Sequence, residues 1–358
     1  MVLTTRILSA TNPTGIAMHR NNCFDIIRLV AALMVLYSHH FALSGFNEPV
    51  IAGFESPGGI AVILFFAISG FLISQSGLRS GDFASFMAKR CRRIFPALIP
   101  CSIFVFVIIG SAFHSNDLTS YLSGDVLYKI LQTVTLQNAN SRDLTDGFIY
   151  PSGMLGSLWS LPVEFACYLV IGLVVSVTNS PRLYPAIFAS FLVAACYVIK
   201  TGYSDFFFNV PVDLFVTRGM CFFLGASMSM SIKHWNKTSI KIFSVVMVSI
   251  YLATATSGVD HKISGYILFT IIAIFIGVTF NDALIKGRFD YSYGIYIYAF
   301  PVQQLCINTL NVGFYTSMIL STVITITLAS LSWHFVEKRF LFRSKRVTEK
   351  ATDSVLSN

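Results

Sequence analysis

The sequence predicts an all-α, polytopic integral membrane protein of about ten spanning helices with both termini in the cytoplasm. Hydrophobic residues make up 54% of the 358 residues and charged residues only 12%, which is roughly half the charged fraction of a typical soluble domain. Apolar runs recur almost to the end of the chain, and each is long enough to cross a hydrocarbon core about 30 Å thick. Together these observations exclude a water-soluble fold.

Ten apolar runs bounded by charged residues, Gly or Pro are predicted as membrane spans. They lie at 24–44, 58–78, 94–114, 155–178, 183–200, 211–232, 239–257, 263–280, 290–310 and 314–336. The connection 115–154 is long and polar, and its stretch 125–137 is predicted as a short interfacial helix. The chain therefore divides into a cytoplasmic N-terminal segment (1–23), a membrane domain (24–340) and a cytoplasmic basic tail (341–358).

The distribution of Lys and Arg predicts the orientation, since cytoplasmic loops carry an excess of them. With a cytoplasmic N-terminus, the outer loops hold only four of the 25 Lys and Arg residues, and Arg28 and Arg218 lie within spans. The four are Lys129, Arg142, Lys200 and Lys262. All the others face the cytoplasm, which favours an even number of spans and places both termini inside.

Several function classes are disfavoured by composition. The net charge of +8 follows from basic cytoplasmic loops, and no basic stretch is interleaved with aromatic residues as a nucleic-acid surface would be. The seven cysteines are scattered without a CxxC pair, so they are interpreted as small apolar core residues. No His, Cys and Asp spacing is typical of a structural zinc site, and the first apolar run is too long for a signal peptide. We expect no metal and no nucleic-acid partner.

Two polar residues share one face of the first span. Arg28 and His39 are eleven residues apart, which is three helical turns plus roughly 20°, and their axial separation is about 16 Å. An arginine inside a span costs at least about 2.5–3.5 kcal/mol unless it is paired or faces water. The alternative is a snorkelling Arg28 and a His39 at the outer interface. The neighbouring His40 points about 100° away from Arg28 and is the second choice.

Three other segments carry charge at or within spans. The stretch Lys89-Arg-Cys-Arg-Arg93 precedes Pro96, and it is either a cytoplasmic anchor or a patch of Arg90, Arg92 and Arg93 that binds phosphate. Glu164 lies in an apolar run and needs a partner, for which Arg28 and Arg218 are candidates. By contrast, Glu337 at the end of the last span is expected to pair at the surface.

Taken in order, five segments make the chain resemble the membrane-bound acyltransferase-3 family over nearly its whole length. They are Arg28 with His39, FFAISGF at 65–71, RCRRIFP at 90–96, LWSLPVE at 158–164 and SYGIYIYAFP at 292–301. The resemblance implies that His39 is the essential histidine and Arg28 its partner, and that Arg90 and Arg93 form the Arg-x-x-Arg pair. It also places Glu164 on the glutamate of the tryptophan motif. Many members have a histidine where this chain has Ala299, which puts a catalytic need for that later histidine in doubt.

The resemblance also implies an activity. Members O-acylate cell-surface glycans such as O-antigen or exopolysaccharide, so we expect an O-acetyltransferase of the bacterial cytoplasmic (inner) membrane. Acetyl-CoA would be the donor, bound from the cytoplasm at Lys89, Arg90, Arg92 and Arg93. The catalytic residues would be His39, Arg28 and Glu164, with His39 acting as general base or carrying the acetyl group. The bilayer and a glycan or lipid-linked saccharide acceptor are the other partners. A transporter or flippase of a lipid-linked saccharide is the alternative.

Overall fold

A computed structural model of the chain describes residues 22–80, 82–113, 121, 124–137, 139–178, 180–255 and 258–341. The predicted segment 1–23 lies outside these residues except for its last two positions, and the predicted tail 341–358 lies outside them except for Leu341. The elements are α1 Phe24–Leu43, α2 Pro57–Leu78, α3 Phe83–Ile103, the π-turn η1 Phe104–Ile109, α4 Gly110–Phe113, α6 Gly124–Val134, η2 Arg142–Thr145, η3 Gly156–Trp159, α7 Ser160–Val177, α8 Leu183–Thr201, β1 Phe206–Phe207, β2 Val210–Pro211, α9 Val212–Met230, α10 Ile232–Trp235, α11 Thr238–Thr254, α12 Gly258–Thr279, α13 Ser292–Thr309, α14 Phe314–Ser332 and the π-turn η4 Trp333–Glu337.

The protein is an all-α polytopic membrane protein, and a two-residue antiparallel pairing of β1 with β2 is the only sheet in the described residues. Seven helical segments there are long and apolar enough to cross a membrane: Phe24–Leu43, Pro57–Leu78, Phe83–Phe113, Gly156–Val177, Leu183–Thr201, Gly258–Thr279 and Phe314–Leu341. The other three predicted spans coincide with α9, α11 and α13. Crossing by all ten, and the cytoplasmic placement of the termini, stay predictions.

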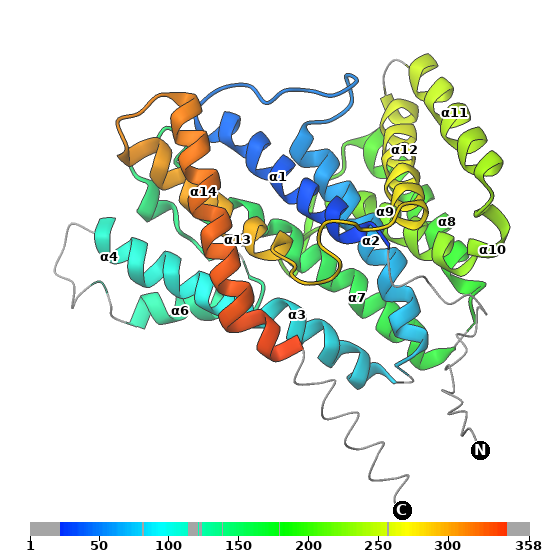
Figure 1. The fold of residues 1–358 in the computed structure, drawn as a ribbon, viewed down its shortest axis with the longest axis horizontal. Coiled ribbons are helices and arrows are strands. Elements are labelled where there is room, and N and C mark those ends of the chain that lie inside the picture. Colours follow the sequence, from blue (N-terminus) through cyan, green and yellow to red (C-terminus); the bar gives the residue numbers. More distant parts are fainter. Residues whose placement is uncertain are drawn as a thin grey trace, which may run out of the picture.

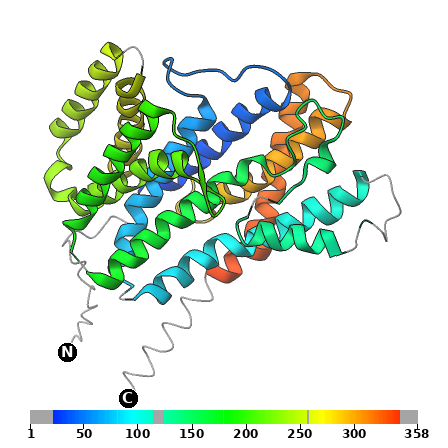
Figure 2. The ribbon, with the colours of Figure 1, turned by 180° about the vertical axis from the view of Figure 1, so that it is seen from behind.

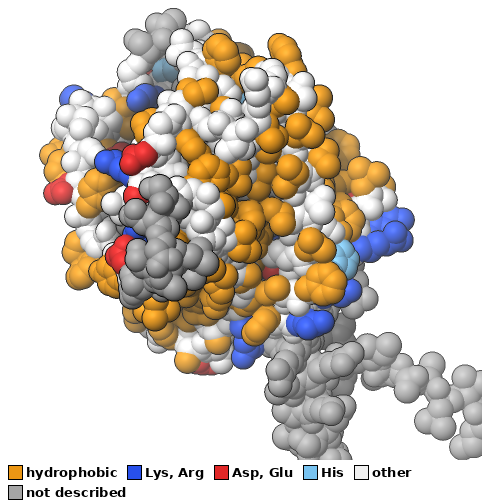
Figure 3. All heavy atoms as spheres, turned by 90° about the vertical axis from the view of Figure 1, so that its left-hand side faces the viewer, with side chains coloured by type: hydrophobic (Ala, Val, Ile, Leu, Met, Phe, Trp, Pro, Cys, Tyr) orange, Lys and Arg blue, Asp and Glu red, His pale blue; other side chains and the backbone are white. Residues whose placement is uncertain are grey.

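The outer surface has the character of a protein that faces lipid. Figure 3 shows one side of the molecule on which hydrophobic side chains predominate and Lys and Arg side chains gather toward the margins. Large apolar side chains are exposed on several of the helices, among them Val193 at 70% and Tyr315 at 73%. Apolar surface of this extent is typical of a bilayer-embedded domain, because lipid tails solvate it.

Helices α2 and α9 form the closest packed pair. A Cβ on Gly70 would lie 1.8 Å from the Phe222 carbonyl oxygen, and a Cβ on Gly225 would lie 2.2 Å from the Ala67 carbonyl oxygen. Glycine is therefore required at both positions for the two backbones to approach, as small residues commonly allow between membrane helices.

Figures 1 and 2 show α11 and α12 at one end of the molecule and α4 and α6 at the other, with α1, α2, α7 and α13 between them.

The third predicted span, 94–114, belongs to a longer helical segment, Phe83–Phe113. Helix α3 starts at Phe83, eleven residues before the predicted start at 94, because Asp82 caps it by accepting a hydrogen bond from the Ser85 N–H at 2.8 Å. The basic stretch thus lies inside a helix instead of preceding one. Pro96 and Pro100 lie within the same helix, where each removes a backbone donor, and the π-turn η1 follows. The predicted helix at 125–137 is confirmed as α6, which packs along α3 and η1.

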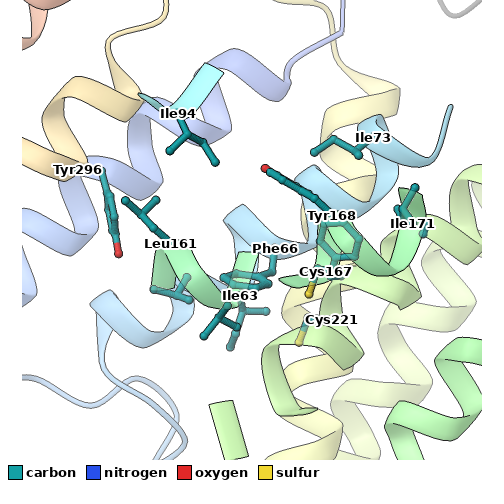
Figure 4. Packing of buried hydrophobic residues seen from close by; sticks show 14 of the residues in the cluster. Ile63, Phe66, Ile73, Ile94, Leu161, Cys167, Tyr168, Ile171, Cys221 and Tyr296 are labelled. Carbon is teal, nitrogen blue, oxygen red and sulfur yellow. The ribbon is translucent and has the colours of Figure 1, made fainter. Parts of the chain in front are cut away.

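The core between α1, α2, α3, α7, α9 and α13 is mainly aliphatic and aromatic. Figure 4 shows part of it, with Tyr168 and Cys167 on α7 facing Cys221 on α9, and Leu161 near Tyr296. The Tyr168 hydroxyl points away from Ile171, toward the side of Leu161 and Tyr296. This hydroxyl marks the place where the packed core meets the cavity described below.

Candidate functional site

A cavity of about 410 Å³ lies between α1, α2, α3, α7 and the start of α13. Its wall contains five of the residues predicted from the sequence: Arg28, Lys89, Arg90, Arg93 and Glu164. Apolar and aromatic side chains such as those of Phe65, Phe66 and Tyr296 complete it. Two predicted site residues, His39 and Arg92, do not line the cavity, and the Arg92 side chain is exposed.

Arg28 lies on the face of α1 that is turned toward the segment leading into α13. Its guanidinium pairs with Asp25 one turn earlier and lies 4.0 Å from the Asp290 carboxylate. The Arg28 Nε is buried without a hydrogen-bond partner. Arg28 is thus paired with carboxylates, as an arginine within a span requires, and the alternative that it snorkels to the membrane surface stays a prediction.

Arg93 is held between two carboxylates. Its Nη2 lies 2.6 Å from Asp290 Oδ2 and its Nη1 lies 3.4 Å from Glu337 Oε2. Glu337 is only 2% exposed and also accepts a hydrogen bond from Ser332 Oγ at 3.0 Å. The expectation that Glu337 pairs at the surface is thus wrong: the helical turn η4 directs it inward, and its charge is compensated by Arg93. We call Arg93, Asp290 and Glu337 the arginine clamp.

Asp290 joins the clamp to Arg28. Burial favours the neutral form of the Asp290 carboxyl. The charge of Arg93 opposes this effect most strongly, followed by the charge of Arg28 and the hydrogen bonds from Ser292. Together they hold the pKa of Asp290 well below its ordinary value. The Ser292 hydroxyl and backbone N–H both donate to Asp290 Oδ1, at 2.5 and 3.2 Å. One ionised carboxylate therefore positions two arginines from different helices at the cavity wall.

Arg90 and Lys89 are cavity cations for which no ion pair with a carboxylate is present among the described residues. Arg90 lies over the Phe86 ring, 5.8 Å from its centroid, and its Nη2 donates to Ser76 Oγ at 3.4 Å. Lys89 is exposed and donates to Ser80 Oγ at 3.0 Å. Because their charge is not neutralised by a neighbouring carboxylate, these two side chains are free to contact an anionic ligand in the cavity.

Glu164 has partners that differ from those expected. Its Oε1 accepts hydrogen bonds from Ser69 Oγ at 2.6 Å and from the Tyr168 hydroxyl at 2.5 Å. The ion pair expected with Arg28 or Arg218 is absent from the described residues, since Arg28 pairs as above and Arg218 pairs with Glu55 at 3.4 Å. Helix packing brings hydroxyl donors to Glu164 in place of a cation. Ser69 on α2 thus has a specific polar contact with α7.

The two adjacent histidines have different environments. His40 is fully buried, and its Nε2 lies 3.0 Å from Ser317 Oγ and 3.1 Å from the Phe314 carbonyl oxygen. Its Nδ1 lies 3.3 Å from Gln303 Nε2. His39 packs edge-on against the Phe300 ring at 5.4 Å, and its Nδ1 is buried with no hydrogen-bond partner in the described residues. His40 therefore has the contacts of a structural residue, whereas His39 keeps a ring nitrogen unoccupied.

The predicted alignment of Arg28 with His39 is confirmed in the sense that both face α13 and the residues leading into it. Arg28 approaches Asp290 just before the start of α13, and His39 contacts Phe300 in its middle. No hydrogen bond joins His39 to Glu164 in the described residues, so the predicted catalytic residues occupy two places: Arg28 and Glu164 at the cavity, and His39 farther along α1. Ala299, which stands where a histidine was expected, is buried at 1% exposure beside Phe300.

Sequence reasoning missed Asp290 and the buried role of Glu337. The signal for Asp290 was present, because an ionisable residue at the start of a predicted span needs a partner. The signal for Glu337 was ambiguous, since Lys338 and Arg339 beside it offered a simpler pairing. Among the described residues, no cluster of three His, Cys, Asp or Glu side chains could hold a metal ion. The site can bind an anionic ligand at Arg90 and offer an imidazole at His39.

Comparison with known proteins shows what the chain is similar to. Residues 21–334 match the acyltransferase domain family. The chain is 48% identical over 329 residues to the O-acetyl transferase of Shigella phage Sf6, covering 91% of this chain and 98% of that protein. It is 29% identical over 353 residues to nodulation protein 10 of Rhizobium leguminosarum bv. viciae, covering 89% and 93%. A putative peptidoglycan O-acetyltransferase of Bacillus subtilis is 23% identical over 388 aligned positions, covering 93% and 58%. No solved structure matches the chain.

Proposed function

Because the chain belongs to the acyltransferase domain family and is an acyltransferase, we propose that it moves an acetyl group from cytoplasmic acetyl-CoA to a glycan hydroxyl. The acceptor is a cell-surface glycan, reached on the outer side of the bacterial inner membrane. A relative named as an O-acetyl transferase that aligns with most of the chain supports the acetyl group. The family match favours an enzyme over the alternative of a transporter or flippase.

The observation that carries the proposal is that Arg28, in the wall of the cationic cavity, and His39 lie on the same helix α1 and both face α13 and the residues before it. The cavity wall holds Arg90 and Lys89, whose charges suit the pyrophosphate and 3′-phosphate of coenzyme A. Arg28 lies on the same wall, about 16 Å along the helix axis from His39. The distribution of Lys and Arg among the loops predicts the orientation of α1, with Arg28 toward the cytoplasm and His39 toward the outer side.

The chemistry needs one proton acceptor near the acceptor hydroxyl. The imidazole of His39 takes the hydroxyl proton as the oxygen attacks the thioester carbonyl. The carbon–sulfur bond then breaks, and the proton passes from the imidazolium to the leaving coenzyme A thiolate. Transfer through an acetyl-histidine has the same overall balance in two steps. Glu164, fixed by Ser69 and Tyr168, contributes a polar wall to the donor cavity.

The experiment compares His39→Ala with His40→Ala in cells that otherwise lack the gene. NMR of the surface glycan measures O-acetyl content, and chromatography of the detergent-extracted protein measures the folded fraction. The loss of a general base costs about 10²- to 10⁴-fold, so His39→Ala should remove nearly all acetylation while the protein still inserts. His40→Ala should reduce the folded fraction, because three hydrogen-bonding groups lose their partner, but each folded molecule should keep its activity. Wild-type acetylation by His39→Ala would refute the mechanism.

A further inference from the structure

A second cavity of about 380 Å³ lies beside the first, at the junction of α6, the segment 137–142 and η3. Its wall includes Thr133, Gln137, Asn140, Arg142, Ser152 and Trp159. Neither the proposed donor nor His39 uses it. Its position in the connection between the third and fourth predicted spans places it toward the outer side under the proposed orientation.

The wall of this cavity is held by hydrogen bonds within the loop. Ser141 Oγ accepts from the Met154 N–H at 2.9 Å, and the Gly153 N–H donates to Thr145 Oγ1 at 3.1 Å. On the far side of the loop, Gln304 Nε2 donates to the carbonyl oxygens of Tyr150 and Gly153, at 2.9 and 3.2 Å. A wall fixed in this way is formed before any ligand arrives, which lowers the entropic cost of binding.

The polar residues that line the cavity have the chemistry of a saccharide site. The Gln137 amide, the Ser152 hydroxyl and the Arg142 guanidinium have no side-chain hydrogen-bond or ion-pair partner among the described residues. The Asn140 amide uses only its oxygen, which accepts from the Arg142 backbone N–H at 3.1 Å. Amides and hydroxyls can donate to and accept from sugar hydroxyls, and the half-buried Trp159 indole offers a flat apolar face with a polar edge.

The balance of charge distinguishes this cavity from the first. One cation, Arg142, and no carboxylate contribute to its wall in the described residues, whereas five cations line the first cavity: Arg28, Arg79, Lys89, Arg90 and Arg93. A coenzyme with several phosphates would be poorly neutralised here, and a lipid tail would leave the polar groups without partners. A neutral or weakly anionic polyhydroxylated ligand satisfies both the amides and the indole.

One aromatic ring, that of Phe300, lies close both to the wall of the second cavity and to His39. Gly156 lines the cavity, and a Cβ there would lie 2.4 Å from Phe300 Cζ. The same Phe300 ring packs edge-on against the His39 imidazole, with the ring centroids 5.4 Å apart. The next residues of the chain, Ser160 and Leu161, line the first cavity. The segment 156–161 therefore forms the partition between the two cavities.

We propose that this second cavity is the acceptor subsite, which binds a saccharide unit of the glycan through Trp159, Gln137, Asn140 and Arg142. This inference rests on the proposed function, since it assigns the acceptor of the same transfer reaction. The sugar ring stacks on the Trp159 indole, and the amides select its hydroxyl pattern. Phe300 separates the bound sugar from His39 and directs the reacting hydroxyl past Gly156 toward the imidazole.

The test uses the full-length protein in nanodiscs with acetyl-CoA and unacetylated surface glycan isolated from cells that lack the gene. Gln137→Ala combined with Asn140→Ala removes two side-chain amides that can hydrogen-bond the sugar hydroxyls. We expect the KM for glycan to rise about 10-fold, with the KM for acetyl-CoA unchanged. Gln132→Ala on α6, outside the cavity wall, is the matched control and should leave both values unchanged. Trp159→Ala should raise the glycan KM further, and Trp159→Phe should restore part of the affinity.

Each outcome decides the inference. An unchanged glycan KM in the double variant, or an equal rise in both KM values, would overturn the acceptor subsite while leaving the proposed function intact. If the wild-type protein acetylates no glycan, the proposed function fails, and direct binding decides the subsite separately. In that case thermophoresis with the same glycan is compared between the wild-type protein and the double variant. Weaker binding by the variant supports the subsite, and equal binding overturns it.

Discussion

The arginine clamp makes a quantitative prediction about non-additive stability. Arg93 lies 2.6 Å from Asp290 and 3.4 Å from Glu337, and its side chain is 24% exposed. Two opposite charges about 4 Å apart attract by about 4 kcal/mol at an effective dielectric constant of about 20, and desolvation offsets much of this. The two carboxylates share one cation, so either alone still compensates it.

Asp290→Asn or Glu337→Gln should therefore each cost about 1.5 kcal/mol, the lower end for a hydrogen bond to a charged group. The double variant leaves Arg93 without a carboxylate, and an unpaired buried charge costs about 5 kcal/mol at the upper end. The coupling between the two sites is then about 2 kcal/mol. At about 2 °C per kcal/mol, the apparent Tm in detergent should fall by about 3 °C for each single variant and by about 10 °C for the double variant.

Lys129 offers a matched control, because it also lies between two carboxylates, Asp125 at 3.2 Å and Asp143 at 2.9 Å. These carboxylates are 68% and 39% exposed, so each replacement by Asn should cost less than about 1 kcal/mol and the two should add. Thermal unfolding of the detergent-extracted proteins, followed by the fraction that stays monodisperse, measures all the variants. A clamp double variant whose Tm loss equals the sum of its singles would refute the shared-cation argument.

Two further predictions concern the same cavity. Arg90→Ala removes a cation with no carboxylate within ion-pair distance in the described residues, so the Kd for acetyl-CoA should rise about 10- to 100-fold, as expected for the loss of a charge-assisted hydrogen bond. Arg142→Ala should leave that Kd unchanged, and calorimetry with the purified proteins measures the Kd of both variants. Equal affinities in the two variants would show that Arg90 does not bind the donor and would favour its interpretation as a membrane anchor. The second prediction follows from the depressed pKa of Asp290. A lowered folded-state pKa gives stability that is fully present above the ordinary Asp pKa of about 3.9 and is lost as the pH falls through the folded value. Glu337 shares Arg93 with Asp290 and titrates with it, so the comparison is made in the Glu337→Gln protein. The Tm difference between Glu337→Gln and the Asp290→Asn, Glu337→Gln double variant should stay constant from about pH 5 to about pH 8 and shrink only below about pH 4, and a difference that changes between pH 5 and 8 would contradict the assignment.

Most helix positions could be predicted from the sequence because apolar runs report burial in lipid or core directly. The first and fourth predicted spans, 24–44 and 155–178, differ from the observed Phe24–Leu43 and Gly156–Val177 by one residue at each end or less. The start of α3 was missed because the basic stretch 89–93 interrupts the apolar pattern of its first half. Hydropathy detects the part of a helix in the bilayer and is blind to an extension outside it, where a cap such as Asp82 decides the boundary.

The site was only partly predictable, and the errors have a common physical cause. The helical period placed Arg28 and His39 on one face, and the structure has both turned toward α13 and the residues before it. The partners of Glu164 and Arg93 lie on helices distant in sequence: Ser69 on α2 for the former, and Asp290 and Glu337 for the latter. Pairing between helices depends on their rotation and depth, which periodicity along a single helix does not report.

The sequence alone determined the class of this protein, its family resemblance and the pairing of a histidine with an arginine on one helical face, because these follow from composition and the 3.6-residue period. Tertiary structure decided which polar groups are already satisfied. His40 has partners on both ring nitrogens, Arg93 is neutralised, and His39 and Arg90 keep capacity for a ligand. That distinction depends on distances between helices, since hydrogen bonds and ion pairs are lost within about an ångström of misplacement.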